Sequence, residues 1–399
     1  MSISDPFSEL IAPFSRRGVD LGLNRIEAAL AELGHPEQRF VALQVAGTNG
    51  KGSIATMVER IATAAGVRCG LYTSPHLLSW CERIRLPKGT IAEEELKRLL
   101  RRLQPVALRH DLTPFELITV SAFVAFAEAE VELAVLEVGL GGRLDATTVH
   151  PRRDVLAFAS IGLDHIEHLG PTLEAIAQEK AAVMNPGAIA VSGPQAPEVT
   201  AVLQAQATAR DCELRWRDPL PGQADGGPAL GLHGDLQRSN AAVAIAAAEA
   251  LREKGWAIPD DAVRRGLQQA RWPGRLELRQ FRGQALLIDG AHNPPAAAAL
   301  RQELEPAQRR WLIGMQRHKD APDLLRQLLE PGDQVRVVPL PEHASWSADE
   351  LRPELPGIEE GANELSENLE WLVQSEGLPV ACGSLYLVAA LLPLLDPTD

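Results

Sequence analysis

The sequence has 399 residues, of which 45% are hydrophobic and 23% are charged, and its formal net charge is −14. A chain of this size and composition can bury more than one core, which favours two domains. The acidic balance argues against nucleic-acid binding through charge. No apolar run approaches the roughly 20 residues of a membrane span, and the N-terminal residues carry no secretory signal pattern. We therefore expect a cytoplasmic protein with no nucleic-acid or membrane partner.

The four cysteines stand far apart, at Cys69, Cys81, Cys212 and Cys382, and no two form a CxxC pair. Cys69 and Cys382 lie in apolar, strand-like runs. We therefore expect buried thiols rather than disulfides or a cysteine metal site. This cysteine usage fits a reducing compartment.

Apolar runs and helix-period segments alternate along the first part of the chain. Strands are expected at residues 40–46, 68–73, 131–138, 155–161 and 188–191. A helix is expected over residues 53–65, because apolar residues from Ile54 to Ile61 repeat at helical spacing and Gly66 ends the pattern. Strands that alternate with helices predict an α/β fold with a mostly parallel sheet covered on both faces.

A second alternating series begins after a junction at residues 271–282. The segment 218–234 is rich in Pro and Gly and predicts a surface loop, and a helix is expected over 240–254. Further strands are expected at residues 285–288, 311–314, 334–340 and 379–381. We place the boundary near residue 278. This gives an N-terminal domain of residues 1–277 with a phosphate-loop type of sheet, and a smaller Rossmann-like α/β domain of residues 278–399.

The most informative stretch is VALQVAGTNGKGS, residues 41–53. An apolar strand runs into a glycine-rich turn that carries Lys51, and a helix is expected to begin at Ser53. Inward-pointing backbone N–H groups, the positive end of the helix and the lysine charge can together bind a polyphosphate. Val45 stands where the strict Walker pattern has glycine, so an ordinary strand-to-helix turn remains the alternative.

Polar residues stand where the expected strands end, which is where ligands of open α/β sheets bind. Ser74 follows the second strand, Glu137 closes the third, and Asp164 and His165 follow the fourth. A hydroxyl, a carboxylate and an imidazole near a phosphate loop indicate a magnesium site, although imidazole is a less usual ligand for this ion. The alternative for Glu137 is a solvated strand end.

Lys180 interrupts the apolar stripe of the expected helix at residues 171–184, where Ile176 and Ala177 share one face. One interpretation is a lysine whose stem covers the core while its ammonium group reaches water. The other is a lysine aimed into the site. A neutral lysine amine can also react with carbon dioxide to form a carbamate, whose oxygens would hold a metal ion.

These segments together resemble the Mur ligase superfamily, and within it the folylpolyglutamate synthases and their bifunctional dihydrofolate synthase forms. The resemblance spans nearly the whole chain. The matching segments are GTNGKGS (47–53), TSPHL (73–77), ERIRL (82–86), LEVGLGGRLDAT (136–147), IGLDHIEHLG (161–170), QEKA (178–181), RWPGRLE (271–277), DGAHNP (289–294) and GSLYLV (383–388).

The resemblance implies an ATP-dependent amide ligase, in which ATP phosphorylates a substrate carboxylate and the amine of L-glutamate attacks the acyl phosphate. The implied ATP-binding residues are Thr48, Asn49, Gly50, Lys51, Gly52, Ser53, Asn240, Arg275, Asp289 and His292. His292 is also a candidate for the glutamate site. Ser74, Glu137 and His165 would hold two Mg²⁺ ions, with Lys180 carbamylated. The implied catalytic residues are Lys51, Lys180, His165 and Arg275.

The resemblance also implies a site for the pterin of dihydropteroate or folate in the N-terminal domain, with the C-terminal domain on the glutamate side. The matching positions are Val19, Asp20, Leu21, Thr113, Pro114, Phe115, Glu116, Leu144, Asp145 and Ala146. Thr148 departs from the family, which usually has Asn there, and Leu86-Pro87 departs from the usual polar turn. The family suggests a monomer. The alternatives are a Mur ligase acting on a peptidoglycan precursor and a non-catalytic nucleotide-dependent switch.

Overall fold

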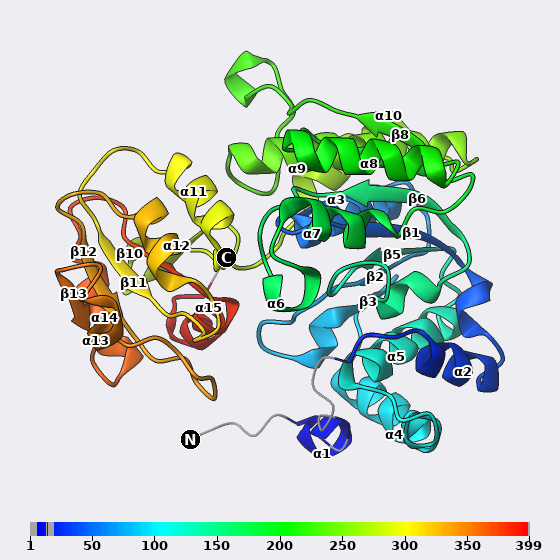
Figure 1. Ribbon diagram of the computed structural model, residues 1–399, viewed down its shortest axis with the longest axis horizontal. Coiled ribbons are helices and arrows are strands. Elements are labelled where there is room, and N and C mark those ends of the chain that lie inside the picture. Colours follow the sequence, from blue (N-terminus) through cyan, green and yellow to red (C-terminus); the bar gives the residue numbers. More distant parts are fainter. Residues whose placement is uncertain (1–5, 13, 15–19, 398–399) are drawn as a thin grey trace. The chain divides into compact units, whose positions relative to one another are not determined.

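The computed structural model describes residues 6–12, 14 and 20–397. The chain divides into two compact units (Figure 1). The first holds the described residues up to Gly231 together with Gln237–Arg271, and the second holds Leu232–Leu236 and the described residues from Trp272 onward. The main part of the second unit begins at Trp272, and the sequence analysis placed the boundary near residue 278.

The first unit is built on an eight-stranded sheet of order β4-β3-β2-β5-β1-β6-β7-β8. The strands are β1 (Val41–Ala46), β2 (Cys69–Tyr72), β3 (Ile84–Leu86), β4 (Gly89–Thr90), β5 (Leu133–Glu137), β6 (Arg153–Phe158), β7 (Ile189–Ser192) and β8 (Glu213–Trp216). All neighbouring strands in the part β2-β5-β1-β6-β7-β8 of this sheet are parallel, and β3 and β4 add an antiparallel edge next to β2. This arrangement confirms the predicted α/β class.

Helices cover both faces of this sheet (Figure 1). The helices of this unit are α1 (Ser8–Ile11), α2 (Asn24–Glu32), α3 (Lys51–Ala64), α4 (Glu93–Arg109), α5 (Pro114–Glu128), α6 (Ile166–Leu169), α7 (Leu173–Ala181), α8 (Pro197–Ala209), α9 (Asp235–Glu253) and α10 (Asp260–Gln269). One core packs α2, α4 and α5 against β5, and another packs α7 and α8 against β6 and β7. Helix α3 lies against β1, β2 and β5, and α10 packs on α3.

The apolar stripe predicted for the first helix is buried in α3, where Ile54, Met57 and Ile61 are at most 1% exposed. The helix begins at Lys51, two residues earlier than predicted, because Gly50 adopts a left-handed conformation (φ 98°) that turns the chain directly into the first helical turn. Gly66, also left-handed, follows its C-terminal end.

The second unit has a six-stranded sheet of order β13-β12-β11-β14-β10-β9. Its strands are β9 (Glu277–Phe281), β10 (Gln284–Ile288), β11 (Arg310–Ile313), β12 (Gln334–Val337), β13 (Ile358–Glu360) and β14 (Val380–Cys382). All pairs are parallel except β9 with β10. The helices are α11 (Pro294–Gln302), α12 (Ala321–Leu328), α13 (Ala348–Leu351), α14 (Leu365–Leu372) and α15 (Leu385–Leu391).

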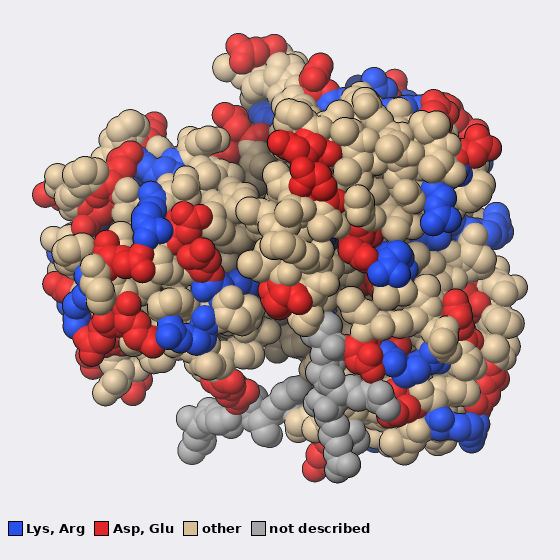
Figure 2. Space-filling model, in the orientation of Figure 1, with Lys and Arg blue, Asp and Glu red and all other residues tan. Residues whose placement is uncertain are grey.

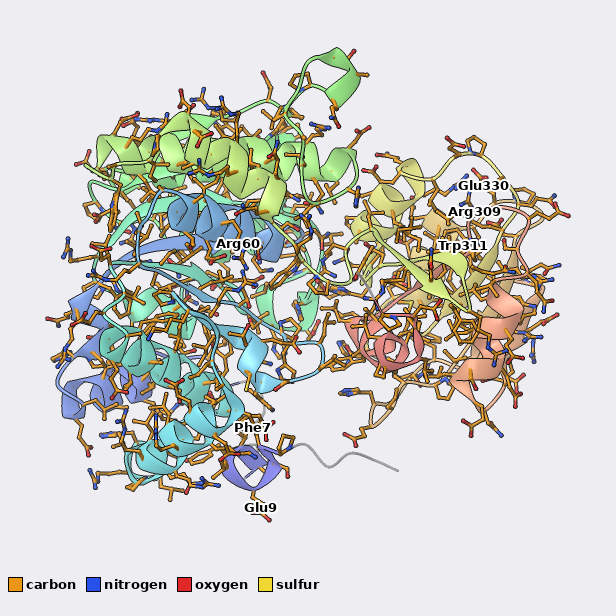
Figure 3. The ribbon with its side chains drawn as sticks, turned by 180° about the vertical axis from the view of Figure 1, so that it is seen from behind. Phe7, Glu9, Arg60, Arg309, Trp311 and Glu330 are labelled. Carbon is orange, nitrogen blue, oxygen red and sulfur yellow. The ribbon has the colours of Figure 1, made fainter. Side chains whose placement is uncertain are left out.

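Trp311 anchors the core of the second unit and is fully buried. Its indole N–H donates to Asp333 at 2.9 Å, which satisfies the one polar atom of a large apolar ring. The guanidinium of Arg309 lies 6.0 Å from the ring centroid, and the two residues lie together in Figure 3. This unit therefore has a core of its own.

The strands that the sequence analysis missed lie at or next to sheet edges: β3, β4, β8, β9 and β13. They are short, and charged residues such as Glu213, Arg215 and Glu359 interrupt their apolar pattern. An edge strand is solvated on one side, so it lacks the continuous apolar run of a buried parallel strand.

All four cysteines are buried and unbridged, as predicted. Within the part of the chain that the structure describes, none of the helices combines the length and apolar character that a bilayer crossing requires. Figure 2 shows acidic and basic side chains of the described residues intermixed on the face in view.

Candidate active site

The phosphate loop connects β1 to α3 and is held by the segment that follows β6. The backbone N–H groups of Thr48 and Asn49 both donate to the carbonyl of Ser160, at 2.7 and 3.1 Å. The Thr48 hydroxyl and Gly162 are also hydrogen-bonded, at 3.1 Å. A Cβ atom on Gly47 would lie 2.7 Å from Ala159 Cβ, so this close approach requires glycine. Two neighbouring strand ends therefore fix the loop.

Lys51 and the residues after it complete the phosphate-binding arrangement. The Lys51 ammonium donates to the carbonyl of Thr48 at 3.0 Å, which folds the side chain back over the loop. Gly52 and Ser53 are buried in the first turn of α3. The free N–H groups at the start of a helix and its dipole attract an anion to this point.

Asn240, a candidate ATP-site residue, lies against the phosphate loop. It is buried on α9, and a Cβ atom on Gly50 would lie only 2.4 Å from Asn240 Oδ1. Its amide nitrogen donates to Gln237 Oε1 at 3.0 Å. Gln237 is also buried and was missed by the sequence analysis. The only sequence signal for Gln237 was its position one helical turn before Asn240.

Ser74 and Glu137 meet at the ends of two neighbouring parallel strands, β2 and β5. The backbone N–H of Ser74 donates to Glu137 Oε2 at 3.1 Å. Glu137 is 4% exposed, which rules out a solvated strand end. A buried carboxylate beside a hydroxyl offers the hard oxygen ligands that Mg²⁺ prefers.

His165 follows β6 and stands at the same edge of the sheet. It adopts a left-handed backbone conformation (φ 50°), and its backbone N–H donates to Asp164 Oδ1 at 2.9 Å. Its ring lies 3.9 Å from Asp164 and 3.7 Å from Glu167, and the side chain is 38% exposed. Among the described residues, no three His, Cys, Asp or Glu side chains form a metal cluster. A metal ion here would also need hydroxyl or phosphate oxygens.

Lys180 is 4% exposed, so its ammonium group does not reach water and the surface-lysine interpretation is wrong. Burial, and after it the positive charge of Lys51, lower the pKa of Lys180 to about 7. Asp164 opposes this shift. Because the charge of Lys51 contributes to the lowered pKa, Lys180 lies within electrostatic reach of the phosphate-loop lysine. The loop that follows β5 packs on α7 here, because a Cβ on Gly142 would lie 2.7 Å from the Glu179 carbonyl.

The four strands that carry these groups are neighbours in the order β2-β5-β1-β6, and all are parallel. Neighbouring strands lie about 4.8 Å apart, so their four ends fall within about 15 Å. The strand order therefore brings the phosphate loop, Ser74 and Glu137 to one edge of one sheet, whereas His165 lies further along the chain, at the start of α6.

In the second unit, Asp289, Arg275 and His292 lie around the end of β10. Asp289 is buried, and its carboxylate accepts the backbone N–H groups of Leu276 and Ala291, both at 2.7 Å. Burial raises the pKa of Asp289, while the charge of Arg275 opposes the rise. His292 Nδ1 lies 2.8 Å from the Gly290 carbonyl, so this nitrogen donates and Nε2 is the acceptor in the neutral ring.

On the expected pterin side, Val19 lies outside the described residues. Thr113 and Glu116 form a capping box at the start of α5, with Pro114 as the first helical residue. Phe115 is half-buried, and its ring lies 6.1 Å from that of Tyr72. Leu21 is exposed.

Asp145 anchors its own loop. It is 1% exposed, and its carboxylate accepts the backbone N–H groups of Gly139, Leu140 and Thr147 and the Thr147 hydroxyl, at 2.6 to 3.0 Å. Ala146 is buried and Leu144 half-buried beside it.

Thr148, at the position where the family usually has Asn, also ties this loop to the sheet. Its hydroxyl donates to the Gly142 carbonyl at 2.7 Å and accepts from Gln44 Nε2 at 2.9 Å. Gln44 lies on β1 and is fully buried. The departure from the family pattern is therefore compatible with a fixed loop.

Comparisons with known proteins identify the family to which this chain is similar. Residues 45–209 match the family described as Mur ligase middle domain, and residues 275–394 match dihydrofolate synthetase, C-terminal domain. The dihydrofolate synthase/folylpolyglutamate synthase of Escherichia coli is 33% identical over 95% of this chain and 92% of its own.

Two solved structures are similar over nearly the whole chain. The E. coli FolC complex with DHPP and ADP has a TM-score of 0.86 and 28% identity, covering 98% of each chain. A bifunctional folylpolyglutamate synthase/dihydrofolate synthase with Mn, AMPPNP and L-glutamate bound has a TM-score of 0.85 and 30% identity, also covering 98% of each chain.

The fold and the site together define an ATP-dependent ligase of the Mur type. Within that class, the chain belongs to the dihydrofolate synthase/folylpolyglutamate synthase family.

Proposed function

We propose that this protein joins L-glutamate to dihydropteroate, to reduced folates, or to both, at the expense of ATP. The observation that carries the proposal is the gathering of a phosphate loop and a buried carboxylate at the ends of neighbouring parallel strands, with the buried Lys180 of α7 within electrostatic reach of Lys51. The relatives support the substrate class, since similar structures hold DHPP, ADP, AMPPNP and L-glutamate.

The reaction needs activation of a carboxylate, which is a poor electrophile. Transfer of the γ-phosphoryl group of ATP to a carboxylate oxygen gives an acyl phosphate, and the amine of glutamate then displaces phosphate. The charge of the transferred group spreads over its oxygens in the transition state. The Lys51 ammonium and the backbone N–H groups in the first turn of α3 would stabilise that charge.

Ser74, Glu137 and His165 would hold Mg²⁺, and two ions are proposed. The bound ions would neutralise the triphosphate and polarise the transferred phosphoryl group. Carboxylate and hydroxyl oxygens suit such a hard cation, and the backbone of Ser74 is hydrogen-bonded to the buried Glu137 carboxylate.

Lys180 is proposed to be carbamylated. Its amine, with a pKa lowered to about 7, is partly neutral at physiological pH. The lone pair of the neutral amine attacks the carbon of carbon dioxide, an N–C bond forms while one C=O π bond opens onto oxygen, and the nitrogen then releases one proton to water. The resulting carbamate carries a negative charge, and its oxygens can join the metal ligands.

Arg275, Asp289 and His292 are proposed to complete the ATP site from the second unit, with His292 also a candidate for the glutamate side. Their support is the buried Asp289 carboxylate, which accepts backbone N–H groups from the residue before β9 and from a residue after β10. We further propose a monomer in the cytoplasm, where the four buried thiols would stay reduced.

A panel of acceptors tests the substrate assignment. Purified protein with ATP, magnesium and L-glutamate should release phosphate when dihydropteroate or tetrahydrofolate is added. Comparison of the two acceptors separates the two folate reactions. A peptidoglycan precursor should give no stimulation. Release with that precursor and with no pterin would reject the assignment, and tight ATP binding without any acceptor-dependent turnover would indicate a switch.

A further inference from the structure

The first unit has a cavity of about 850 Å³ where β8 meets the end of α8 and the end of α9. These three elements carry labels in the upper part of Figure 1. Ligand sites in proteins typically have volumes of about 300–1,000 Å³. The cavity is therefore large enough for a small organic molecule.

This cavity is separate from the phosphate loop. Gly187 and Asp211 line it and stand just before β7 and β8, at the amino ends of these strands. The phosphate loop follows the carboxyl end of β1, which runs parallel to them. In the order β1-β6-β7-β8, β8 is the third strand from β1, about 14 Å away at about 4.8 Å per strand. A ligand in the cavity would therefore not overlap the proposed nucleotide site.

The floor of the cavity is apolar. Ile189, Ala207 and Cys212 line it and are at most 8% exposed. Leu214 and Trp216 are half-buried and pack on the core formed by α7 and α8. Burial raises the pKa of the Cys212 thiol to about 11, so this group stays neutral. The floor can therefore bury the alkyl and aromatic parts of a ligand.

The rim of the cavity is charged, and its charges are unequally paired. Glu213 and Glu253 both bind the guanidinium of Arg215, at 2.8 Å and at 2.6 and 2.7 Å. The ammonium of Lys254 donates to a backbone carbonyl of the turn before β7, at 2.7 Å. Among the described residues, none donates a hydrogen bond to the carboxylate of Asp211. Three carboxylates against two cations give the rim a net negative charge, which favours a cationic ligand.

The position of Asp211 is set by its backbone. Its carbonyl accepts the N–H of Gly187 at 2.9 Å, and its own N–H donates to the Thr208 carbonyl at 3.4 Å. Its φ of 51° is left-handed, a conformation in which Asp and Asn are enriched among residues other than glycine. The carboxylate is therefore a fixed acceptor at one end of the cavity.

Trp216 marks the other end of the cavity. It lies five residues after Asp211, and a strand rises about 3.3 Å per residue, so the two residues stand up to about 16 Å apart. The half-buried indole ring offers a flat apolar face to a ligand. A molecule that contacts both residues must be elongated.

We propose that this cavity binds an elongated organic amine with an aromatic end. The ammonium group donates to the Asp211 carboxylate, the alkyl chain lies over the apolar floor, and the aromatic ring packs on Trp216. This inference goes beyond the proposed function and does not depend on it.

Isothermal titration calorimetry on the wild-type protein tests the ligand class with three probes. 4-Phenylbutylamine should bind at least about tenfold more tightly than 5-phenylpentanoate, which has the same ring and methylene chain but the opposite charge. Benzylamine keeps the charge and the ring but is too short to reach both ends, so it should bind at least about fivefold more weakly than 4-phenylbutylamine. Equal affinities for the long amine and the long carboxylate would overturn the inference.

Variants test the site. Asp211→Asn should weaken the binding of 4-phenylbutylamine about tenfold, because a charge-assisted hydrogen bond is lost. Asparagine also suits the left-handed backbone, so this variant should fold. Trp216→Leu should weaken binding about fivefold through loss of the aromatic contact. The control is Asp225→Asn, which removes the same charge from an exposed turn outside the cavity and should leave the affinity unchanged.

Competition separates this cavity from the proposed catalytic site. Magnesium with AMPPNP and L-glutamate should leave the Kd for 4-phenylbutylamine unchanged. Displacement of the amine by these ligands would place it in the catalytic site and overturn the inference. Unchanged affinity in both Asp211→Asn and Trp216→Leu, or no binding at millimolar amine, would do the same. Because none of these measurements needs turnover, a failure of the proposed function would leave the inference standing.

Discussion

Lys180 shows how burial changes the chemistry of one side chain. An ordinary lysine is almost fully charged at neutral pH, whereas the pKa of Lys180 is lowered to about 7 by burial and by the charge of Lys51. The amine is therefore available as a nucleophile towards carbon dioxide. The same burial would be costly if the side chain had no role, since a charged group in the interior is destabilising.

Replacement of this lysine tests the carbamate directly. Lys180→Ala should lower kcat by about a hundredfold or more, because a charged group near the transferred phosphoryl is lost. Added acetate or formate should restore part of the activity, since a small carboxylate can enter the vacated space. The control is Lys254→Ala, an exposed lysine at the end of α9, which should keep full activity. Full activity of Lys180→Ala without additives would contradict the carbamate.

Lys180 should also give the stability of the protein a pH dependence. Its folded pKa of about 7 lies below the ordinary value of 10.5, so the unfolded chain binds more protons between these values. The free energy of unfolding should therefore rise with pH through this window, relative to Lys180→Met, by at most about 1.4 kcal/mol per pH unit. Urea unfolding in carbon dioxide-free buffer from pH 7 to pH 10 measures the difference. Parallel curves for the two proteins would show that the pKa is not lowered.

At the scale of elements, the loop between β5 and the segment before β6 connects the expected pterin side to α7. Asp145 ties this loop to its own backbone, and Thr148 ties it to Gln44 on β1. Gly142 then brings the loop against the helix that carries Lys180. A change at this contact should therefore move the lysine without touching it.

Gly142→Ala tests that coupling. The added Cβ would lie 2.7 Å from the Glu179 carbonyl, a backbone atom that cannot swing away. We expect a loss of about 1–3 kcal/mol in the free energy of unfolding, together with a lower kcat. Gly193→Ala is the control, because its Cβ would meet nothing closer than 3.5 Å. Chemical denaturation measures the free energy of unfolding of both variants, and phosphate-release assays measure their kcat. Equal losses in the two variants would contradict the coupling.

At the scale of the whole molecule, the two units have separate sheets and separate cores. The phosphate loop and Asn240 belong to the first unit, so nucleotide should bind there and stabilise it by mass action. At a concentration one hundred times Kd, this amounts to about 2.7 kcal/mol.

Thermal unfolding with magnesium and a non-hydrolysable ATP analogue tests this expectation. The Tm of the transition that belongs to the first unit should rise by several degrees, about 2–4 °C per kcal/mol for a unit of this size. Lys51→Ala should lose most of the rise while keeping the Tm of the free protein. An equal rise in wild type and Lys51→Ala would place the nucleotide elsewhere.

Sequence reasoning located the buried central strands and α3 and selected the candidate active-site residues, because the signals for all of these are local. A phosphate loop is a contiguous run, and a polar residue at the end of an apolar strand is visible without knowing its neighbours. Edge strands such as β8 and β9 escaped it, since their charged residues carry no burial pattern. Sequence reasoning also missed Gln237, because its place one turn before Asn240 does not reveal that its side chain is buried.

By itself, the sequence determined the α/β class, the phosphate loop and the family resemblance, since these depend on the order and spacing of short segments. Only the tertiary structure decided that β2, β5, β1 and β6 are neighbours and that Lys180 is buried within electrostatic reach of Lys51. The physical reason is that strand order and burial arise from packing between distant segments. A side chain's charge state and its partners therefore exist only once those segments have met.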